Sequence, residues 1–278
     1  MKLARYLVEG EPRLGEVVGD EVRELVVGPA ADAVETLVQP RHDRGAVLAQ
    51  RRLADVQLLS PVIAPSKILC IGLNYRDHGR ETGTPEPSEP ILFAKYPNTI
   101  VGPGDHVRWS ARDSTEVDWE VELAVVMGRR TSRVSAAEAL DHVLGYTIAN
   151  DVSARDVQFS NGGQWSRGKS FDTFLPLGPW VVTADELGDP QAVHLRALVS
   201  GTSMQDSSTS QMIFSVAEII SFLSRTMTLE AGDVIATGTP YGVGFTRNPP
   251  RYLRDGDVVR LEVDEIGVLE NPVSMRDD

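Results

Sequence analysis

The chain has 278 residues, of which 41% are hydrophobic and 24% charged, so it can bury a full-sized core and is not expected to be disordered. Its formal charge of −13, from 40 acidic and 27 basic residues, disfavours nucleic acid and anionic membranes as partners. Cys70 is the only cysteine, which excludes an internal disulfide. With no apolar run of signal-peptide or membrane-spanning length, we expect a cytoplasmic protein that acts on a small molecule.

Residues 1–62 are expected to form a small N-terminal α+β domain. Alternating apolar residues between turn-forming Gly and Asp predict strands at residues 2–8, 13–18 and 22–26. Helical spacing of apolar residues predicts helix between residues 30 and 59. Pro61 and Pro65 then interrupt regular structure, because a proline disfavours the helical conformation of the residue before it. We therefore place a domain boundary near residue 62.

Residues 63–278 read as a predominantly β domain with few helices. Strands are predicted at residues 68–72, 91–94, 117–127, 145–149, 180–183, 195–200, 234–238 and 258–263. Two Ser-x-x-Glu capping boxes, at residues 135–138 and 215–218, predict helices that end at Gly145 and near Thr226. Many strands with few helices predict sheets that curl or pack face to face.

Acidic residues alternate with apolar ones along residues 116–123. Successive side chains of a strand point to opposite faces, so Glu120 and Glu122 share one face. One interpretation is the solvated outer face of a half-buried sheet. The other is a site for a hard cation, with Asp151, at the end of the strand predicted at 145–149, as a third oxygen ligand. Spacing alone does not decide between them.

Several motifs, taken in order, resemble those of the fumarylacetoacetate hydrolase superfamily over roughly residues 65–273. They lie at residues 72–78, 119–123, 145–158, 168–172 and 237–244. Residues 164–174 and 248–253 resemble the small bacterial-type acylpyruvate hydrolases and an oxaloacetate tautomerase-like branch. The resemblance implies a mixed β-sandwich roll after a small N-terminal domain, usually in a homodimer. It also implies that Glu120, Glu122 and Asp151 bind Mg²⁺ or Mn²⁺, with Ca²⁺ possible.

His78 and Glu81 stand three residues apart, so one helical turn would place them on the same face. A carboxylate can fix the imidazole tautomer and raise its basicity, and the resemblance implies that this pair activates water. The alternative is that His78 and Glu81 form a surface pair with no catalytic role. The Gly- and Pro-rich residues 81–90 are expected to form a mobile loop, and the resemblance implies that this loop closes as a lid over bound substrate. Gln158 is expected to face the lid as a substrate-binding residue, and the alternative for residues 81–90 is a disordered surface loop.

The resemblance places Lys169 beside the metal-bound substrate, where its ammonium would stabilise an enolate or hydrogen-bond a ligating carboxylate. Arg155 is a candidate substrate contact, and the structural alternative for it is an ion pair with Asp156 or Asp172. Thr239, in a Gly-rich turn, is the candidate contact to the substrate carboxylate.

The function expected from these residues is metal-dependent hydrolysis of an acylpyruvate-type 2-oxo acid. A C–C bond would be cleaved through a metal-stabilised enolate by water that His78 activates. Decarboxylation of oxaloacetate and keto–enol tautomerisation or isomerisation on the same site are the alternatives, since all pass through the same enolate. A metal-stabilised binding scaffold without catalysis is a third possibility, which the presence of His78, Glu81 and Lys169 disfavours.

Overall fold

Strands dominate the computed structural model, which describes residues 1–25, 34 and 47–276. Within these residues, one sheet has 12 strands, in the order β4-β3-β2-β1-β14-β12-β11-β17-β6-β7, with β5 beside β1 and β8 beside β14. Its strands are β1 (Lys2–Val8), β2 (Glu11–Val18), β3 (Glu21–Leu25), β4 (Val47–Arg52), β5 (Gln57–Leu59), β6 (Ile68–Gly72), β7 (Ile91–Lys95), β8 (Ile100–Val101), β11 (Val121–Met127), β12 (Val143–Asn150), β14 (Leu175–Thr183) and β17 (Val234–Ala236).

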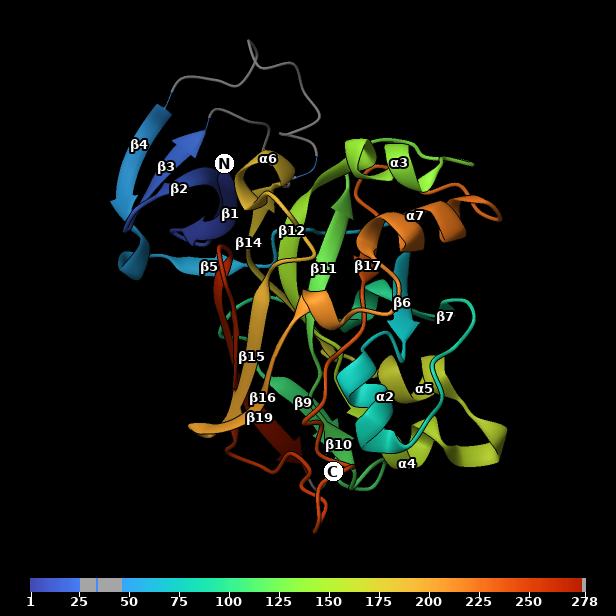
Figure 1. Cartoon of the computed structure of the whole chain (residues 1–278). Coiled ribbons are helices and arrows are strands. Elements are labelled where there is room, and N and C mark those ends of the chain that lie inside the picture. The colour runs from blue at the N-terminus through green and yellow to red at the C-terminus, as the bar shows by residue number, and fades with distance from the viewer. Residues whose placement is uncertain (26–33, 35–46, 277–278) are drawn as a thin grey trace.

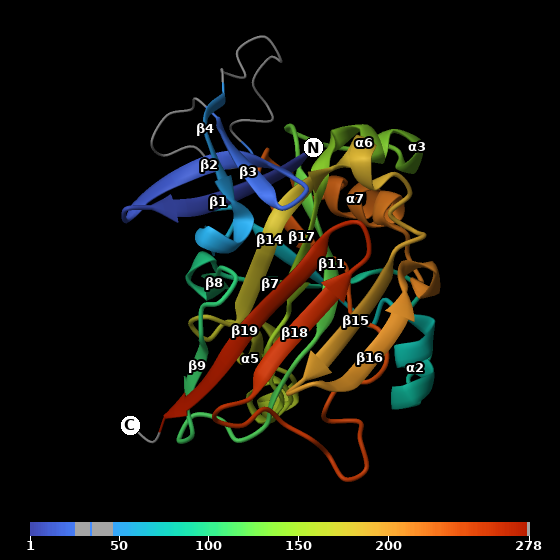
Figure 2. The ribbon, with the colours of Figure 1, turned by 90° about the vertical axis from the view of Figure 1, so that its left-hand side faces the viewer.

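A second sheet lies across the first and closes the roll (Figures 1 and 2). Its five strands, in spatial order, are β16 (Thr202–Ser208), β15 (His194–Val199), β18 (Val258–Val263), β19 (Gly267–Arg276) and β9 (Val107–Ser110). The short strands β10 (Val117–Asp118) and β13 (Ser153–Ala154) pair separately. Leu123 and Ile148 of the first sheet share one buried core with Leu195 and Leu261 of the second. The predicted β-rich fold is confirmed.

The helices that lie wholly within the described residues are few and short. They are α2 (Arg76–Thr82), α3 (Ala136–Ala139), α4 (Arg155–Gln158), α5 (Trp165–Lys169), α6 (Ala184–Leu187) and α7 (Val216–Ser224), with single turns at Leu53–Asp55, Pro97–Thr99, Leu140–His142, Ser160–Gly162 and Thr209–Gln211. Both predicted capping boxes form, at the starts of α3 and α7. The prediction that the first helix continues to Gly145 is wrong, because the chain from Val143 onward pairs with β11 and β14 instead.

The N-terminal strands form a meander that continues the large sheet, since Lys2 and Leu3 of β1 pair with β14. The helix predicted between residues 30 and 59 is wrong for residues 47–59: β4 pairs with β3, and β5 pairs with β1. These long-range ladders override a local spacing that also suits a helix. Apart from Val34, the earlier part of that prediction lies outside the described residues, and the boundary at residue 62 stays a prediction.

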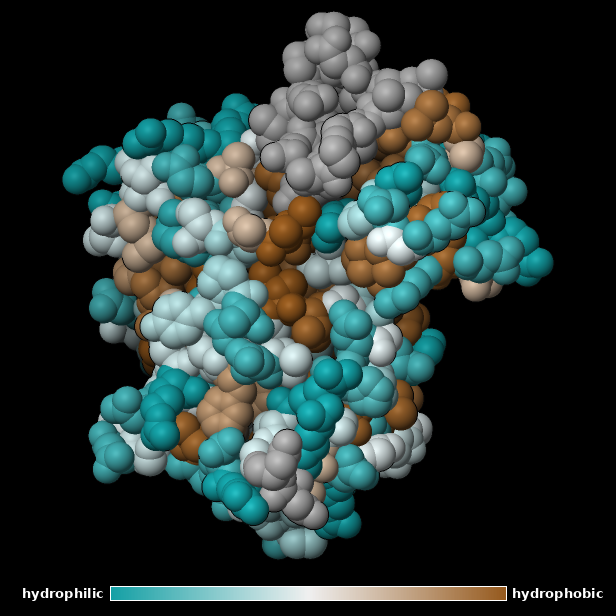
Figure 3. Space-filling view, turned by 180° about the vertical axis from the view of Figure 1, so that it is seen from behind, coloured by the Kyte–Doolittle hydropathy of each residue, from teal (hydrophilic) through white to brown (hydrophobic). Residues whose placement is uncertain are grey.

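The face turned away from the viewer of Figure 1 carries a strip of apolar residues near its middle, bordered by hydrophilic ones (Figure 3). Contiguous apolar surface of this kind often marks a contact with another molecule. The homodimer stays a prediction, because a single chain is described. Within the described part of the chain, no helix has the length and apolar character needed to cross a membrane.

Asn74 joins the end of β6 to the start of α2, which carries His78. Its fully buried side-chain amide donates to the carbonyl oxygens of Phe214 (3.0 Å) and Thr237 (2.8 Å) and accepts from the Phe214 amide (2.8 Å). Replacement Asn74→Ala leaves these backbone groups without hydrogen-bond partners, so we expect it to lower the free energy of unfolding by about 2–4 kcal/mol. Urea denaturation measures this change.

The matched control is Asn98→Ala, which removes an exposed amide that donates to Ser170 and Asp172. Its expected effect lies within about 0.5 kcal/mol. Equal losses in the two variants would show that the buried amide of Asn74 does not fix the start of α2.

Candidate metal centre and active site

Three carboxylates meet below the surface: Glu120, Glu122 and Asp151. Each offers one oxygen, and these oxygens lie within 4.8 Å of one another. The three residues are 6%, 1% and 0% exposed, respectively. The acidic side of this segment is therefore buried, and its interpretation as a solvated sheet face is wrong.

Local strand pairing brings the carboxylates together. The acidic segment is interrupted between β10 and β11, and β11 then pairs antiparallel with β12, Val121 opposite Asn150. Asp151 directly follows β12, and its amide donates to the carbonyl oxygen of Glu120 over 3.0 Å. Trp119 lies in the interruption between β10 and β11, and its side chain is fully buried in the core.

Lys169, at the end of α5, bridges two of the three carboxylates. Its ammonium lies 2.8 Å from Glu120 Oε2, 2.8 Å from Asp151 Oδ2 and 2.7 Å from Ser153 Oγ. An ammonium has three N–H donors, so these contacts use all of them. Lys169 is expected to contact either an enolate or a ligating carboxylate, and in the structure it contacts two carboxylates.

Lys95, which the sequence analysis missed, is a second buried lysine at the site. It is 2% exposed, and its ammonium donates to Asp151 Oδ1 over 2.7 Å and to the Val152 carbonyl oxygen over 3.1 Å. Its signal in the sequence is weak: an ionisable residue directly after the apolar strand predicted at residues 91–94. Both oxygens of Asp151 thus face a lysine.

Arg155, at the start of α4, is held by carboxylates on the acidic segment. Its Nε donates to Asp118 Oδ2 over 3.0 Å, one terminal nitrogen lies 2.6 Å from Glu120 Oε1, and the other donates to Gln158 Oε1 over 2.9 Å. Asp118, a further residue without a predicted role, also accepts the backbone amides of Gly244 and Phe245. Arg155 therefore ties α4 to the strands that carry the site.

The ion pair proposed for Arg155 with Asp156 or Asp172 is wrong. Asp156 accepts from Ser114 instead, and Asp172 accepts from Asn98. The buried carboxylates of the acidic segment replace both predicted partners, because the turn after β12 folds back onto β10 through the β10–β13 pairing.

The site holds more negative than positive charge. Four carboxylates (Asp118, Glu120, Glu122 and Asp151) face three cations (Lys95, Lys169 and Arg155), a formal charge of −1. Burial alone would raise the pKa of Glu120, but Lys169 and Arg155 more than offset it and hold that pKa at about 2. Burial, together with the charges of Asp151 and Glu120, raises the pKa of Glu122 well above its usual range.

A divalent cation fits this donor set. All three candidate ligands are carboxylate oxygens, the donors that Mg²⁺ and Mn²⁺ prefer over the nitrogen and sulfur favoured by zinc. Each carboxylate oxygen can accept more than one contact, so the lysines leave lone pairs for a metal. A bound ion would supply the positive charge that Glu122 lacks and change the formal charge of the site to +1, which favours an anionic substrate.

His78 and Glu81 lie on one face of α2, as their spacing predicts. His78 Nδ1 is 3.1 Å from Glu81 Oε2, and Glu81 Oε1 accepts the Gly242 amide over 3.0 Å. Burial would raise the pKa of Glu81, but the hydrogen bonds from His78, Thr246 and Gly242 lower it below its usual value. Glu81 thus holds one nitrogen of the imidazole in place.

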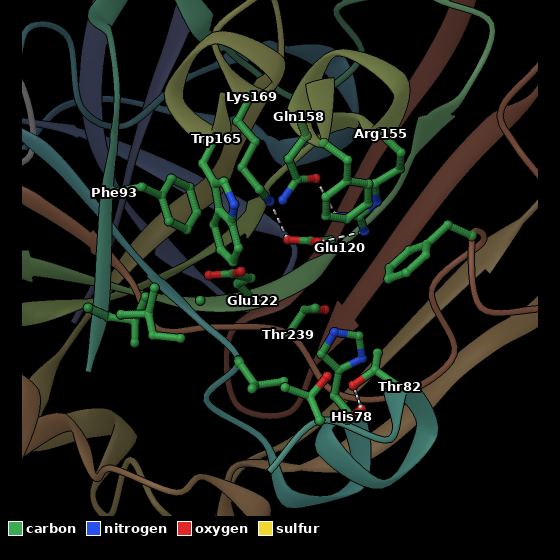
Figure 4. A pocket seen from close by; sticks show the side chains of 17 residues that line it. His78, Thr82, Phe93, Glu120, Glu122, Arg155, Gln158, Trp165, Lys169 and Thr239 are labelled. Atoms are coloured by element: carbon green, nitrogen blue, oxygen red, sulfur yellow. Dashed lines mark hydrogen bonds and ion pairs between the residues drawn. The ribbon is translucent and has the colours of Figure 1, made fainter. Parts of the chain in front are cut away.

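A cavity of about 340 Å³ joins the carboxylates to His78 (Figure 4). Gln158 and Thr239 line it, as does Thr84 of the segment predicted to be a lid. The Thr239 hydroxyl donates to the Val121 carbonyl oxygen and accepts from Gln205, so it is already engaged with the protein. Contacts of Gln158 and Thr239 with a substrate stay predictions.

Comparison with known proteins places the chain in a family. Residues 67–274 match the model of the fumarylacetoacetate (FAA) hydrolase C-terminal domain. The chain belongs to this family. It is 50% identical to the mitochondrial oxaloacetate tautomerase of Xenopus laevis over 221 residues, 79% of this chain and 69% of the relative, and 46% identical to a human one over 239 residues, 86% and 76%.

Solved structures of the fumarylacetoacetate hydrolase family share the fold. The fumarylacetoacetate hydrolase of Exiguobacterium antarcticum is 40% identical, with a TM-score of 0.90 over 99% of this chain and 100% of that one. The maleylpyruvate hydrolase of Sphingobium sp. SYK-6, in complex with manganese(II) and pyruvate, is 31% identical, with a TM-score of 0.82 over 99% and 100%. The chain is thus an enzyme of this family with an acidic metal site.

Removing a ligand charge should weaken metal binding without unfolding the chain. We expect Glu122→Gln and Asp151→Asn each to raise the Kd for Mn²⁺ at least about 100-fold, since each removes one of three anionic ligands. Titration calorimetry measures Kd, and Glu116→Gln, a half-buried glutamate of the same segment outside the triad, is the control. Unchanged affinity in both ligand variants would contradict the site.

The pKa of Glu81 predicts a pH-dependent contribution to stability. A carboxylate whose folded pKa is lowered stabilises the fold above its unfolded pKa, near 4.5, and loses this effect as the pH falls through the folded value. The difference in unfolding free energy between wild type and Glu81→Gln should therefore be greatest at neutral pH and shrink below about pH 4.5. A difference that grows on acidification would be inconsistent with the lowered pKa.

Proposed function

We propose that the enzyme catalyses the keto–enol tautomerisation of a small 2-oxo acid, with oxaloacetate as the first substrate to test and Mg²⁺ or Mn²⁺ as the cofactor. The observation that carries this proposal is one cavity lined by two carboxylates of the triad, Glu120 and Glu122, and by His78, whose Nδ1 lies 3.1 Å from Glu81. Relatives named oxaloacetate tautomerases, 46–50% identical to this chain, support it over the hydrolysis expected from the sequence.

Some residues of the site would stabilise negative charge, and others would transfer a proton. A divalent ion held by the triad would bind the carboxylate and keto oxygens of a 2-oxo acid and stabilise the negative charge of its enolate. Lys169 holds oxygens of Glu120 and Asp151, and Lys95 holds the other oxygen of Asp151. Both lysines thereby fix the direction in which the carboxylates present their remaining lone pairs.

His78 is the proposed carrier of the proton. Figure 4 shows it on the side of the cavity opposite Lys169 and Gln158. Its Nδ1 is held by Glu81, so Nε2 is the nitrogen that can exchange a proton with C3 of the substrate. The negative charge of Glu81 would stabilise the imidazolium that forms, and the burial of His78, 8% exposed, keeps bulk water from competing.

Hydrolysis of an acylpyruvate is the second candidate, and the same His78–Glu81 pair favours it. A neutral imidazole fixed by a carboxylate can also take a proton from water, which would then attack the acyl carbonyl carbon. Oxaloacetate decarboxylation needs the enolate stabilisation alone. Analysis of the products distinguishes the two reactions. Hydrolysis consumes water and splits the substrate, whereas tautomerisation changes neither its mass nor its number of carbon atoms.

The choice of reaction can be measured directly. We expect Mn²⁺-loaded enzyme to accelerate the conversion of enol-oxaloacetate to the keto form, and chelator-treated enzyme to lose this activity. Cleavage of acetylpyruvate and fumarylpyruvate, followed by analysis of the products, should be slower than the ketonisation of enol-oxaloacetate. Rapid cleavage of either, with no effect on the oxaloacetate enol, would favour the hydrolase.

His78→Ala should lower kcat for tautomerisation by about 10²–10⁴-fold, the usual contribution of a general acid–base group. Binding of Mn²⁺ should persist, because His78 is not among the oxygen ligands. The control is His106→Ala, an exposed histidine outside the cavity lining. Full activity of the His78 variant would remove His78 from the mechanism.

A further inference from the structure

The mouth of the cavity is aromatic. Phe159, at the end of α4, lines the cavity and is 52% exposed. Its ring lies 5.7 Å from that of Phe245, centroid to centroid, with 59° between the ring planes, and Phe245 also lines the cavity. Ile91, 37% exposed, also lines the cavity. Exposed apolar side chains gathered at a pocket are typical of a ligand contact.

The inner wall is aromatic as well. Phe93 and Trp165 pack edge to face with centroids 5.5 Å apart, and both line the cavity beside Glu122 (Figure 4). The ammonium of Lys169 lies 5.0 Å from the Phe93 ring centroid. Apolar surface therefore extends from the carboxylate triad to the mouth.

The cavity offers few cations to a second substrate carboxylate. Among the described residues that line it, Arg155 and Lys169 are the only lysine or arginine side chains. Lys169 uses all three donors on the protein, and Arg155 is bound by two carboxylates and by Gln158. His78 changes its charge as it exchanges a proton with the substrate, so it is not a permanent cation of the cavity. A second substrate carboxylate, including that of oxaloacetate, would find only these engaged cations among the described lining residues, whereas an aromatic ring needs no charged partner.

The cavity is also larger than a four-carbon acid requires. Its volume, about 340 Å³, lies in the range of pockets that enclose drug-sized ligands, ~300–1,000 Å³. A 2-oxo acid placed with its carboxylate and keto oxygens at the triad would direct its C3 substituent along the aromatic walls. An aromatic ring at C3 would fill this space and gain apolar and ring–ring contacts.

We propose that the site accepts 2-oxo acids with an aromatic C3 substituent and interconverts the enol and keto forms of arylpyruvates. The inference deepens the proposed tautomerase and rests on it. In the ketonisation step, the enol oxygen releases its proton to water, the C2–oxygen double bond forms, and the electron pair of the C2–C3 double bond takes a proton from the His78 imidazolium. A proton from water then restores the imidazolium. Nothing is oxidised or reduced, and no co-reactant is needed.

Binding tests the aromatic subsite independently of turnover. With Mn²⁺-loaded protein, calorimetry should give a Kd for phenylpyruvate at least about tenfold below that for pyruvate, because the two acids share the same metal-binding end and differ by the ring. Equal affinities would overturn the subsite.

Variants locate the subsite at the mouth. We expect Phe159→Ala to lower the ratio of kcat/KM for enol-phenylpyruvate to that for enol-oxaloacetate by about tenfold. Phe159→Arg supplies a cation for a second carboxylate and should shift the ratio further toward oxaloacetate. The control is Tyr96→Ala, an aromatic residue of similar exposure, 56%, outside the cavity lining. The same ratio in all four proteins would overturn the assignment of Phe159.

The outcomes separate this inference from the proposed function. If neither enol is ketonised, yet phenylpyruvate binds more tightly than pyruvate, the tautomerase proposal fails and the aromatic subsite stands. If oxaloacetate is ketonised, and phenylpyruvate is neither bound more tightly than pyruvate nor ketonised, the aromatic substrate class fails and the tautomerase stands.

Discussion

The site depends on the burial of more carboxylates than cations. A buried carboxylate loses its hydration at a cost of several kcal/mol unless ion pairs and hydrogen bonds replace it. Lys169 and Lys95 replace it for Asp151, and Lys169 and Arg155 do so for Glu120. Glu122 receives one backbone amide, from Gly238, and keeps a raised pKa. A divalent ion beside Glu122 would supply the positive charge that its neighbours do not, which is the physical argument for a metal.

The fold meets this requirement with parts that lie far apart in the chain. The pairing of β11 with β12 places Asp151 beside Glu120, and the interruption between β10 and β11 leaves the backbone of Trp119 and Glu120 outside the strands. Lysines then enter from β7 and from α5, over 56 and 18 residues of sequence separation from Asp151. Strands and short helices on several sides therefore hold the charged groups in place.

Sequence alone predicts those parts of the site that follow from local geometry. Alternation along a strand puts Glu120 and Glu122 on one face, and helical spacing pairs His78 with Glu81. Alternation does not tell a solvated face from a buried one, since burial depends on what packs above the sheet. Lys95 escaped prediction for the same reason: its partner is set by strand pairing. Strand pairing also places residues 47–52 and 57–59 in strands, against their helical spacing.

Charged residues line the inner end of the cavity, and apolar residues line its outer end. At the inner end, Glu120, Glu122 and Lys169 line the cavity, and solved relatives named isomerase and hydrolase show that one fold serves several reactions. At the outer end, Phe159 follows α4, and Phe245 lies in the segment after β17, so neither belongs to the strands that hold the metal ligands. Substitution of Phe159 can therefore change which substrate fits, whereas Phe245 also packs against the buried Arg155 guanidinium, which lies 4.5 Å from its ring centroid. Specificity can therefore vary while the metal chemistry stays constant.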